Sequence, residues 1–509
     1  MNIHGTNIWM YVSSYSEEVT GSNTYVKVNW SDGREIKFVI DCGLFQEIKW
    51  ESHNAEKFPY NPEELDFAIA THFHADHIGR FPYLMNEGFT GIIYTSNESK
   101  LMFPKMLNLT AEILLGQFTT NAMEWRKERN ARKIKNPKGK RDKVKKNSKS
   151  KFVSKCIEHD MPKLIYTKDD VTKLQLQVVG VDYEEAISPA EDLSITFYRN
   201  GHMLGATIAV ITARYNEEEL NVLVTGDYAK INKVTGIESF VPQKVLDKIN
   251  MVICESTYGS SPEMRDIATD YNKHLRVLEE TIQKGKTLVY MTNAIERPLV
   301  ILRELQYIME HEVIGKKLKE LPIFFDSTFG ILGLQMYKKI IGEQELDVPA
   351  NLVPITADDR NLVYASINSR EPTILFLTSP QFFHGSFIAY SRMLLERSNV
   401  TLLFASYISE CVTNTLNLPK GTKIRYRGED MLKNCDMLKV GHFSSHASIS
   451  EIAELLDKCK NKNTILFLHG TSDAKDRMVD RFNEKGVTTY SMLRGKTVRI
   501  NRFGISKVY

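Results

Sequence analysis

Short apolar runs alternate with polar clusters along the first 255 residues, and several of these clusters contain histidine or a carboxylate. Apolar runs of about 4 to 8 residues between polar clusters are typical of buried strands. The pattern predicts a helix at residues 80–87 and strands at 25–30, 35–40, 65–70, 91–95, 194–199, 220–225 and 249–254. It returns near the C-terminus, where it predicts strands at 439–443 and 464–468.

The middle of the chain has a different period. From about residue 260, segments with apolar positions at helical spacing alternate with short apolar runs, which is typical of a parallel sheet covered by helices. Predicted helices lie at 264–284, 298–310, 331–341 and 384–396, and predicted strands at 287–291, 322–325, 373–377 and 401–405. We therefore predict an α/β protein in which a domain of residues 256–436 is inserted between two parts of another, 1–255 and 437–509.

A basic run follows a predicted helix at residues 99–125. Residues 126–155 contain fifteen Lys or Arg and two acids, a local charge of +13 within a chain whose net charge is +3. The run contains Pro137 and Gly139 and has no apolar periodicity, so we expect an insertion that is disordered or ordered only on a partner. Three interpretations stay open: nucleic-acid backbone binding, a solvated loop, and a localisation signal.

Composition excludes several classes of protein. The chain has 509 residues, of which 42% are hydrophobic and 25% charged, as in an ordinary globular protein of two or three domains. No basic segment with an apolar run begins the chain, and no apolar stretch reaches about 18 residues, so we expect neither a signal peptide nor a membrane span. The six cysteines form no Cys-x-x-Cys pair, which argues against a zinc ribbon or a disulfide framework and suits a reducing cytoplasm.

The densest cluster of ligand-type side chains lies at residues 71–79, with the sequence THFHADHIG. It places three imidazoles and one carboxylate within six residues, at a spacing that fits neither a helical face nor a strand face throughout. Such a loop can enclose divalent metal ions. A chance cluster, a solvated loop or an isolated metal scavenger is the alternative.

Other ligand-type residues also follow predicted strands, so one packed sheet would present them along a single edge. They are Asp41, His202, Asp227, Glu255 and His469. Two divalent ions about 3.5 to 4 Å apart could share a bridging carboxylate, activate a water and hold both oxygens of a phosphodiester in reaction. The nitrogen-rich set favours zinc over magnesium.

The ordered motifs carry a family resemblance. DCG at 41–43, THFHADH at 71–77, GHMLGA at 201–206 and TGD at 225–227 resemble the motif series of the metallo-β-lactamase superfamily. ESTYG at 255–259, the α/β insertion, His446 and His469 resemble its β-CASP branch, which contains nucleases. The segment HFSSHAS at 442–448 is similar to that of RNase J and of the pre-mRNA 3′-end cleavage endonuclease. The implied fold is a metallo-β-lactamase αββα sandwich with an inserted β-CASP domain.

The resemblance implies two metal ions, zinc or alternatively manganese. His72, His74 and His202 would bind one ion, Asp76, His77 and His469 would bind the other, and Asp227 would bridge them. Asp41 would orient the ligand loop by hydrogen bonds without contacting metal, or alternatively serve as a turn-forming residue before Cys42 and Gly43.

The resemblance also implies a proton donor and substrate contacts. Glu255 would orient His446, which would protonate the leaving 3′ oxygen, so that Asp76, Asp227, Glu255 and His446 form the catalytic set. A buried structural histidine is the alternative for His446. His442, Ser444 and Ser448 would donate hydrogen bonds to the scissile phosphate, and the loop of Ser379, between a strand and a helix, would contact phosphate through free backbone N–H groups. Helix capping is the alternative for Ser444, Ser448 and Ser379.

Two departures from the family pattern are visible. The usual Gly-Arg-x-Gln segment is Ile295-Glu296-Arg297-Pro298 here, and the usual His-Gly-Glu is His469-Gly470-Thr471. Neither departure changes a predicted metal ligand.

The activity implied is that of a zinc-dependent ribonuclease, an endonuclease, a 5′-to-3′ exonuclease or both, acting on single-stranded RNA. His469 favours RNA, because DNA-processing members of the family are expected to have an apolar residue there. The alternatives are a DNA nuclease of the same fold and an inactive RNA-binding scaffold. A homodimer or an accessory protein is expected as a further partner.

Overall fold

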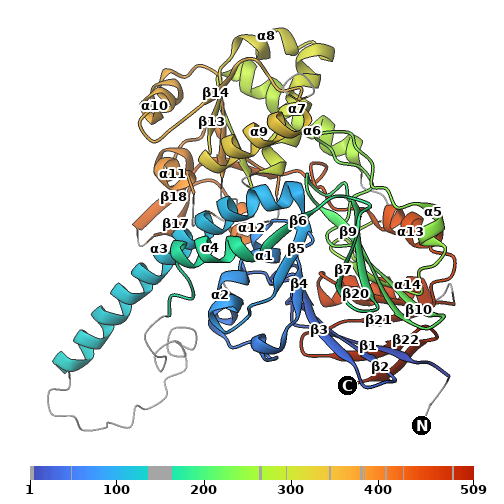
Figure 1. Cartoon of the computed structure of the whole chain (residues 1–509). Helices are drawn as coiled ribbons and strands as arrows, with labels where there is room; N and C mark the ends of the chain where they lie inside the picture. Colours follow the sequence, from blue (N-terminus) through green and yellow to red (C-terminus); the bar gives the residue numbers. More distant parts are fainter. Residues whose placement is uncertain are drawn as a thin grey trace.

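Two mixed β-sheets pack face to face in the larger part of the molecule (Figure 1). The computed structural model describes residues 5–47, 49–135, 163–262, 266–293, 295–342, 346–378, 382, 385–406, 408, 410–427, 429–483 and 486–509. The first sheet contains β1 (Ile8–Ser14), β2 (Thr24–Trp30), β3 (Glu35–Ile40), β4 (Phe67–Ile69), β5 (Ile92–Ser96), β6 (Val178–Val181), β22 (Thr497–Asn501) and β23 (Gly504–Val508). The second contains β7 (Ala186–Ala190), β8 (Leu193–Arg199), β9 (Thr207–Tyr215), β10 (Glu218–Val224), β11 (Met251–Glu255), β20 (Thr464–Leu468) and β21 (Thr488–Ser491).

The strand order places early and late segments of the chain side by side. It is β23-β22-β1-β2-β3-β4-β5-β6 in the first sheet and β21-β20-β11-β10-β9-β8-β7 in the second. Strand β1 pairs with β22, and β11 pairs with β20, so residues beyond 460 complete both sheets. The two parts of the chain predicted to flank an insertion therefore share one sandwich.

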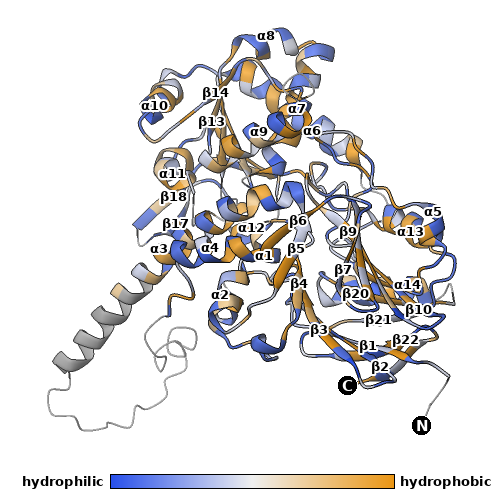
Figure 2. Ribbon diagram, viewed as in Figure 1, coloured by the Kyte–Doolittle hydropathy of each residue, from blue (hydrophilic) through white to orange (hydrophobic). Residues whose placement is uncertain are grey.

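Hydrophobic alternation explains which faces of the sheets are buried (Figure 2). In β2, every second residue from Thr24 to Trp30 is buried, as expected for a strand with one face in a core. Inner-face residues such as Val26, Ile211 and Leu466 pack in one cluster between the two sheets. The core of the sandwich is this layer of side chains.

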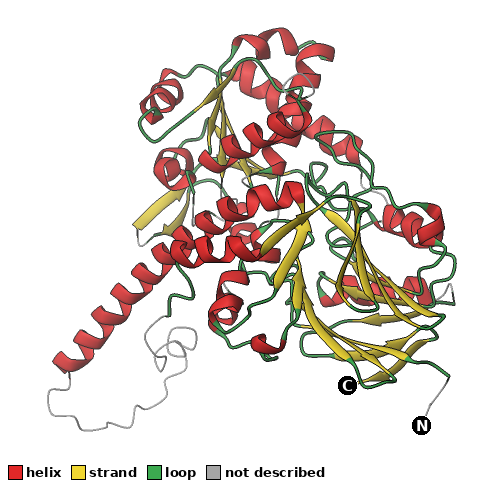
Figure 3. Ribbon diagram, in the orientation of Figure 1, coloured by secondary structure: helices red, strands yellow, loops and turns green. Residues whose placement is uncertain are grey.

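Helices cover the outer faces of both sheets (Figure 3). Helices α1 (Ala75–Ile78), α2 (Phe81–Asn86), α3 (Asn97–Lys135) and α4 (Lys168–Leu174) lie with the first sheet, and α5 (Gln243–Leu246), α13 (Ile449–Lys458) and α14 (Ser472–Asn483) with the second. Short 3₁₀ turns lie at Glu51–Ala55, Pro62–Glu64 and Gln175–Gln177. Phe467 of β20, for example, packs on Phe482 of α14 with ring centroids 5.7 Å apart. The predicted αββα sandwich is confirmed.

A third sheet forms the inserted part, at the top of Figure 1. Its parallel strands are β12 (Thr287–Thr292), β13 (Ile323–Asp326), β14 (Leu352–Pro354), β15 (Thr373–Thr378), β16 (Val400–Phe404) and β19 (Asp436–Lys439), in the order β14-β13-β15-β12-β16-β19. Helices α6 (Ile267–Lys284), α7 (Glu296–His311), α8 (Gly315–Glu320), α9 (Thr328–Ile341), α10 (Arg360–Ser369), α11 (Phe387–Leu395) and α12 (Glu410–Leu416) accompany it, together with a hairpin of β17 (Thr422–Tyr426) and β18 (Glu429–Lys433). The alternation of helices and strands thus builds the parallel sheet that the sequence predicts.

Some predicted boundaries differ from the structure. The division at residue 436 falls on the first residue of β19, which belongs to the six-stranded sheet, and the strand predicted at 439–443 is wrong because β19 ends at Lys439. Helices α1, α4, α5, α8, α10, α12 and α14 lack a counterpart among the predicted elements.

The basic run also begins differently from the prediction. Helix α3 continues through its first ten residues to Lys135, and residues 136–155 lie outside the described residues. Lysine, arginine and alanine favour helix, and the first proline of the run is Pro137, so the local sequence supports this extension. Of the helices that the structure describes, none combines the length and apolar character that a membrane span requires.

Replacing Leu466 by alanine should lower the free energy of unfolding by about 2 to 5 kcal/mol, because it would leave a cavity between the two sheets. Leu466 is fully buried, whereas Leu176 is 89% exposed, so Leu176→Ala is the matched control and should change stability by less than about 0.5 kcal/mol. Chemical denaturation of the three proteins measures the difference. Equal effects of the two substitutions would contradict this account of the core.

Candidate metal centre

The candidate ligands lie where the carboxyl ends of strands from both sheets meet. Strands β3 and β4 are parallel in the first sheet, and β8, β10, β11 and β20 run in one direction in the second. The expectation that one sheet presents all of these residues is therefore wrong, since two sheets contribute. Their ends carry Asp41, the loop of residues 71–77, His202, Asp227, Glu255 and His469.

Four side chains form the first group. The candidate ligand atoms of His72, His74, His202 and Asp227 lie within 4.8 Å of one another. His74 Nδ1 is 3.0 Å from His72 Nε2 and 3.4 Å from His202 Nε2. Asp227 Oδ2 is 3.9 Å from His72 Nε2 and 3.7 Å from His202 Nε2. These nitrogen and oxygen atoms converge as the ligands of one metal ion do.

Asp76, His77 and His469 form a second group within the same limit. Asp76 Oδ2 lies 3.8 Å from His77 Nε2 and 4.0 Å from His469 Nε2. Asp227 stands between the groups, with Oδ2 3.3 Å from His77 Nε2 and Oδ1 3.3 Å from His469 Nδ1. One buried carboxylate thus connects both groups.

The donor atoms of this centre fit metal ions. His77 Nε2, His469 Nε2 and Asp227 Oδ1 are buried without a hydrogen-bond partner, which is costly unless another ligand satisfies them. Burial, together with neighbouring imidazoles, lowers the pKa of His72 and of His202 well below the usual value, so both rings favour the neutral form that binds metal. Although burial opposes ionisation of Asp227, the charges of His469 and His77 lower its pKa well below the usual value.

Asp41 holds the ligand loop from behind. Its carboxylate accepts hydrogen bonds from Thr71 N at 2.8 Å, Thr71 Oγ1 at 2.9 Å and His77 Nδ1 at 2.7 Å, and it belongs to neither group. Its backbone is left-handed, with φ of 61°, so a turn-forming contribution is present as well. A Cβ at Gly43 would lie 1.5 Å from the carbonyl oxygen of Asp76, so this position has room only for glycine.

Glu255 and His446 form a pair beside the two groups. His446 Nδ1 lies 3.0 Å from Glu255 Oε2 and 3.2 Å from Oε1, and His446 Nε2 lies 3.8 Å from Asp227 Oδ2. Glu255 also accepts hydrogen bonds from Thr257 Oγ1 at 2.5 Å and from the backbone N–H of Tyr228. Burial disfavours the imidazolium, but the carboxylates of Glu255 and Asp227 outweigh it and raise the pKa of His446 to about 9. One ring nitrogen is therefore held by Glu255 while the other faces the candidate ligands.

The residues predicted to contact phosphate have different surroundings. Ser448 caps α13, because its Oγ accepts from Glu451 N at 3.4 Å and its own N–H donates to Glu451 Oε2 at 2.7 Å. His442 is 5% exposed, with Nε2 bound to Glu304 and Nδ1 buried, so donation from its side chain to substrate does not agree with this arrangement. Ser444 Oγ accepts from His446 N at 3.3 Å, and its contact with phosphate stays a prediction. Ser379 lies outside the described residues.

Asn200 is a supporting residue that the sequence reading missed. Its Nδ2 donates to the carbonyl oxygens of Thr225 at 2.8 Å and Asp227 at 2.7 Å, while its Oδ1 accepts from His202 N at 3.0 Å. It therefore connects the backbones of two ligand loops. The available signal was an asparagine directly before Gly201 and His202, at the end of the strand predicted at 194–199.

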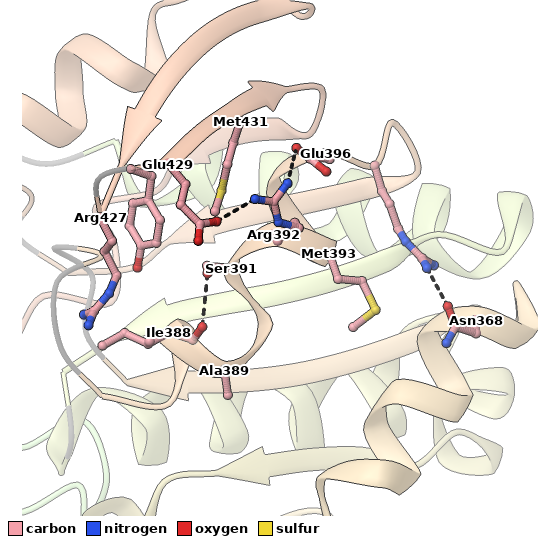
Figure 4. A pocket seen from close by; sticks show the side chains of 12 residues that line it. Asn368, Ile388, Ala389, Ser391, Arg392, Met393, Glu396, Arg427, Glu429 and Met431 are labelled. Atoms are coloured by element: carbon pink, nitrogen blue, oxygen red, sulfur yellow. Dashed lines mark hydrogen bonds and ion pairs between the residues drawn. The ribbon is translucent and has the colours of Figure 1, made fainter.

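A separate cavity of about 700 Å³ lies in the inserted part, between α11 and the β17–β18 hairpin (Figure 4). None of the candidate metal ligands lines it. Arg392 pairs with Glu429 at 2.6 Å and Glu396 at 3.4 Å, and Arg397 donates to Asn368 at 2.5 Å. These two arginines pair with neighbouring side chains. Because no candidate ligand lines the cavity, it is separate from the candidate centre.

Two protein-family models match the chain. One, described as the metallo-beta-lactamase superfamily, matches residues 19–151, and the other, described as a Zn-dependent metallo-hydrolase RNA specificity domain, matches residues 431–492. The first match includes Asp41 and residues 71–77, and the second includes His446 and His469.

Known proteins match over most of the chain. A ribonuclease of Thermus thermophilus is 23% identical over 96% of this chain and 97% of its own length. The transcription termination factor FttA of Methanosarcina mazei is 24% identical over 92% of this chain and 68% of its own length. The cleavage and polyadenylation specificity factor subunit 3-II of Arabidopsis thaliana is 23% identical over 95% of this chain and 71% of its own length. These relatives span both the sandwich and the inserted part.

Among solved structures, a subclass B3 metallo-β-lactamase from a soil metagenome library matches 47% of this chain and 80% of its own, at 13% identity and a TM-score of 0.23. A TM-score this low supports no conclusion about the fold beyond what the sequence matches give.

Replacing Asp227 by asparagine should reduce metal binding to both groups, because this carboxylate lies within reach of each. The metal content of purified protein, measured by mass spectrometry after incubation with zinc and desalting, tests this expectation. His311→Ala serves as the control, since His311 is exposed and bonds to the carbonyl oxygen of Tyr307. An Asp227→Asn protein that keeps the wild-type metal content and affinity would contradict the assignment.

Proposed function

We propose that this chain, which belongs to the metallo-β-lactamase superfamily and to its β-CASP branch of nucleases, is a zinc-dependent ribonuclease that uses two metal ions. The supporting observation is the convergence of two groups of imidazoles and carboxylates around Asp227, next to the Glu255–His446 pair. A cluster of metal ligands alone is found in many kinds of hydrolase. A charged histidine beside the cluster supplies the proton that a poor leaving group needs, and therefore favours a nuclease.

His72, His74 and His202 would hold one ion and Asp76, His77 and His469 the other, with Asp227 shared between them. Zinc suits the five imidazoles, and manganese is the alternative. When bound, the two ions supply Lewis acidity that activates a water and stabilises charge on the phosphate. Asp41 keeps His77 in place by accepting the hydrogen bond from its other ring nitrogen.

The chain's own contribution to bond cleavage lies in His446. Glu255 accepts from Nδ1 and thereby orients the ring, and Nε2 carries the proton for the leaving 3′ oxygen. Glu255 is almost fully buried and receives hydrogen bonds from Tyr228 N and Thr257 Oγ1, so its own position is set by the protein. The pair forms a proton donor whose direction is fixed.

RNA is the proposed substrate over DNA for two reasons. His469 provides an imidazole in the second group, where DNA-processing members of the family are expected to have an apolar residue. The relatives also include a ribonuclease of Thermus thermophilus. Single-stranded RNA, cut within the chain, from the 5′ end or both, is the form we propose. A DNA nuclease of the same fold is the alternative, and an inactive scaffold is disfavoured because every candidate ligand is present and assembled.

The decisive assay incubates end-labelled single-stranded RNA and DNA of matched sequence with the wild-type protein, with and without a chelator. We expect cleavage of RNA that the chelator abolishes. Asp76→Ala should remove a ligand of the second group, and His446→Ala should reduce the rate about 100-fold or more because the leaving oxygen loses its proton donor. The His311→Ala control should behave as wild type.

Two outcomes of that assay would change the proposal. Undiminished RNA cleavage in both Asp76→Ala and His446→Ala proteins would exclude the mechanism. Preferred cleavage of DNA would change only the substrate.

The pH dependence of kcat/KM on RNA gives a further prediction. His446 is the acid in its protonated form, and its pKa is raised to about 9, so the rate should be lost as pH rises through that value. Bound metal ions add positive charge near Nε2 and would move this alkaline limb of the pH profile to lower pH, not higher. The profile of His446→Ala should lack the limb. An identical alkaline decline in wild type and variant would show that another group causes it.

A further inference from the structure

A second cluster of titratable side chains lies in the inserted part, outside the candidate metal centre. It consists of His274 from α6, Glu304 from α7 and His442 from the loop after β19. Glu304 Oε1 lies 2.6 Å from His274 Nδ1, and Oε2 lies 2.9 Å from His442 Nε2. Burial opposes ionisation, yet hydrogen bonds from the two histidines lower the pKa of Glu304 to about 2. The cluster is thus a buried carboxylate held between two imidazoles.

Its geometry is that of hydrogen bonds. Two ligands of a tetrahedral zinc lie about 3.3 Å apart, given zinc–ligand distances of about 2.0 to 2.1 Å. His274 Nδ1 and Glu304 Oε1 are closer than this, and both oxygens of Glu304 lie at hydrogen-bond distance from His442 Nε2, 3.0 and 2.9 Å. His274 Nε2 bonds to the hydroxyl of Tyr290 at 2.5 Å, which sets the orientation of that ring as well.

Further contacts hold the same loop at its N-terminal end. Asp270 of α6 accepts from the backbone N–H of Gly441 at 2.6 Å and of His442 at 3.1 Å. Lys233, on the loop that follows Asp227, donates to the carbonyl oxygen of His442 at 2.5 Å. Residue 442 is therefore held through its side chain, its N–H and its carbonyl group.

The C-terminal end of the loop is held by the sandwich. Ser448 caps α13, and the N–H of Ala447 donates to the carbonyl oxygen of Tyr228 at 2.6 Å. Between the two ends, His202 Nδ1 lies 3.3 Å from the carbonyl oxygen of Ser445, and His446 reaches Glu255. A shift at residue 442 would pass over only three residues to His446.

We propose that Glu304, together with His274 and His442, forms a positioning cluster through which the inserted part sets the place of the His446 imidazole over the metal centre. The inference rests on the proposed function, because it concerns the proton donor of that reaction. Glu304 is thereby a positioning residue: it acts on the reaction through the loop of residues 442–446 and contacts neither substrate nor metal.

The test compares two phosphodiesters with different leaving groups. RNA cleavage needs a proton on its leaving oxygen, whereas bis(p-nitrophenyl) phosphate releases p-nitrophenolate without one. Glu304→Gln should lower kcat on RNA roughly 10- to 100-fold, with KM changed less than about threefold, since a small displacement of a proton donor is costly. Hydrolysis of bis(p-nitrophenyl) phosphate and the metal content should stay at wild-type levels.

A double-mutant cycle makes the test specific. The Glu304→Gln/His446→Ala protein should be no slower on RNA than His446→Ala alone, because the cluster acts through that imidazole. Glu310→Gln, an exposed position on the same helix, is the matched control and should match wild type on both substrates. His274→Gln, whose thermal unfolding is followed in parallel, should reproduce the leaving-group selectivity if Glu304→Gln does not fold.

Three results would overturn the role of the cluster. The first is an equal loss of rate on both phosphodiesters, which indicates a merely structural contribution. The second is a double variant whose loss of RNA cleavage equals the combined losses of the two single variants. The third is a third metal ion in the wild type that Glu304→Gln loses. Wild-type protein that hydrolyses bis(p-nitrophenyl) phosphate but no RNA would instead overturn the proposed function, and the inference with it.

Discussion

The carboxylate of Asp227 is the group on which the candidate centre depends. It is 3% exposed, and burying a charge this deeply is costly unless neighbouring charges and polar groups compensate. His77 and His469 lie 3.3 Å from it, and His72, His202 and His446 lie within 3.9 Å. The imidazoles of His469, His77 and His446 therefore stabilise one buried anion, and cations held at the two groups would stabilise it further.

The two sheets make this concentration of side chains mechanically stable. The candidate ligands His72, His202, Asp227 and His469 stand one to three residues beyond the end of a strand whose body lies in a packed core, so their backbones can move little. Hydrogen bonds from Asn200 and to Asp41 then connect loops that belong to different strands. Rigidity comes from the sandwich, and the relative placement of the loops comes from these buried polar contacts.

The inserted part does more than cover the sandwich. Tyr337 of α9 accepts from the backbone N–H of Leu204, two residues after His202, and donates to Glu296 at the start of α7. Glu296 also accepts from Asn232 at 2.9 Å, and burial raises its pKa to about 7. Glu296 is one of the residues at which the chain departs from the family pattern. The departure thus places a buried carboxyl group between the inserted part and two loops of the centre.

The alternation of apolar runs and polar clusters predicted about half of the described strands and the insertion, because periodicity and strand length are local properties. The αββα class was implied by the family resemblance of the motifs and not by this alternation. It did not determine that the candidate ligands come from two facing sheets, since strand order depends on pairings between residues hundreds of positions apart. The predicted helix at 99–125 also ends ten residues before α3 does, because lysine and arginine favour helix and no proline occurs between residue 125 and Pro137.

The sequence by itself singled out the candidate ligands of the centre and their order along the chain. Spacing within residues 71–77, and position after an apolar run, are enough to single out such side chains. Only the tertiary structure decided that Ser448 caps a helix, that His442 bonds to Glu304, and that Asn200 ties two loops together. The physical reason is that a polar side chain takes its partner from whatever the fold brings within about 3 Å, and that partner can lie anywhere in the sequence.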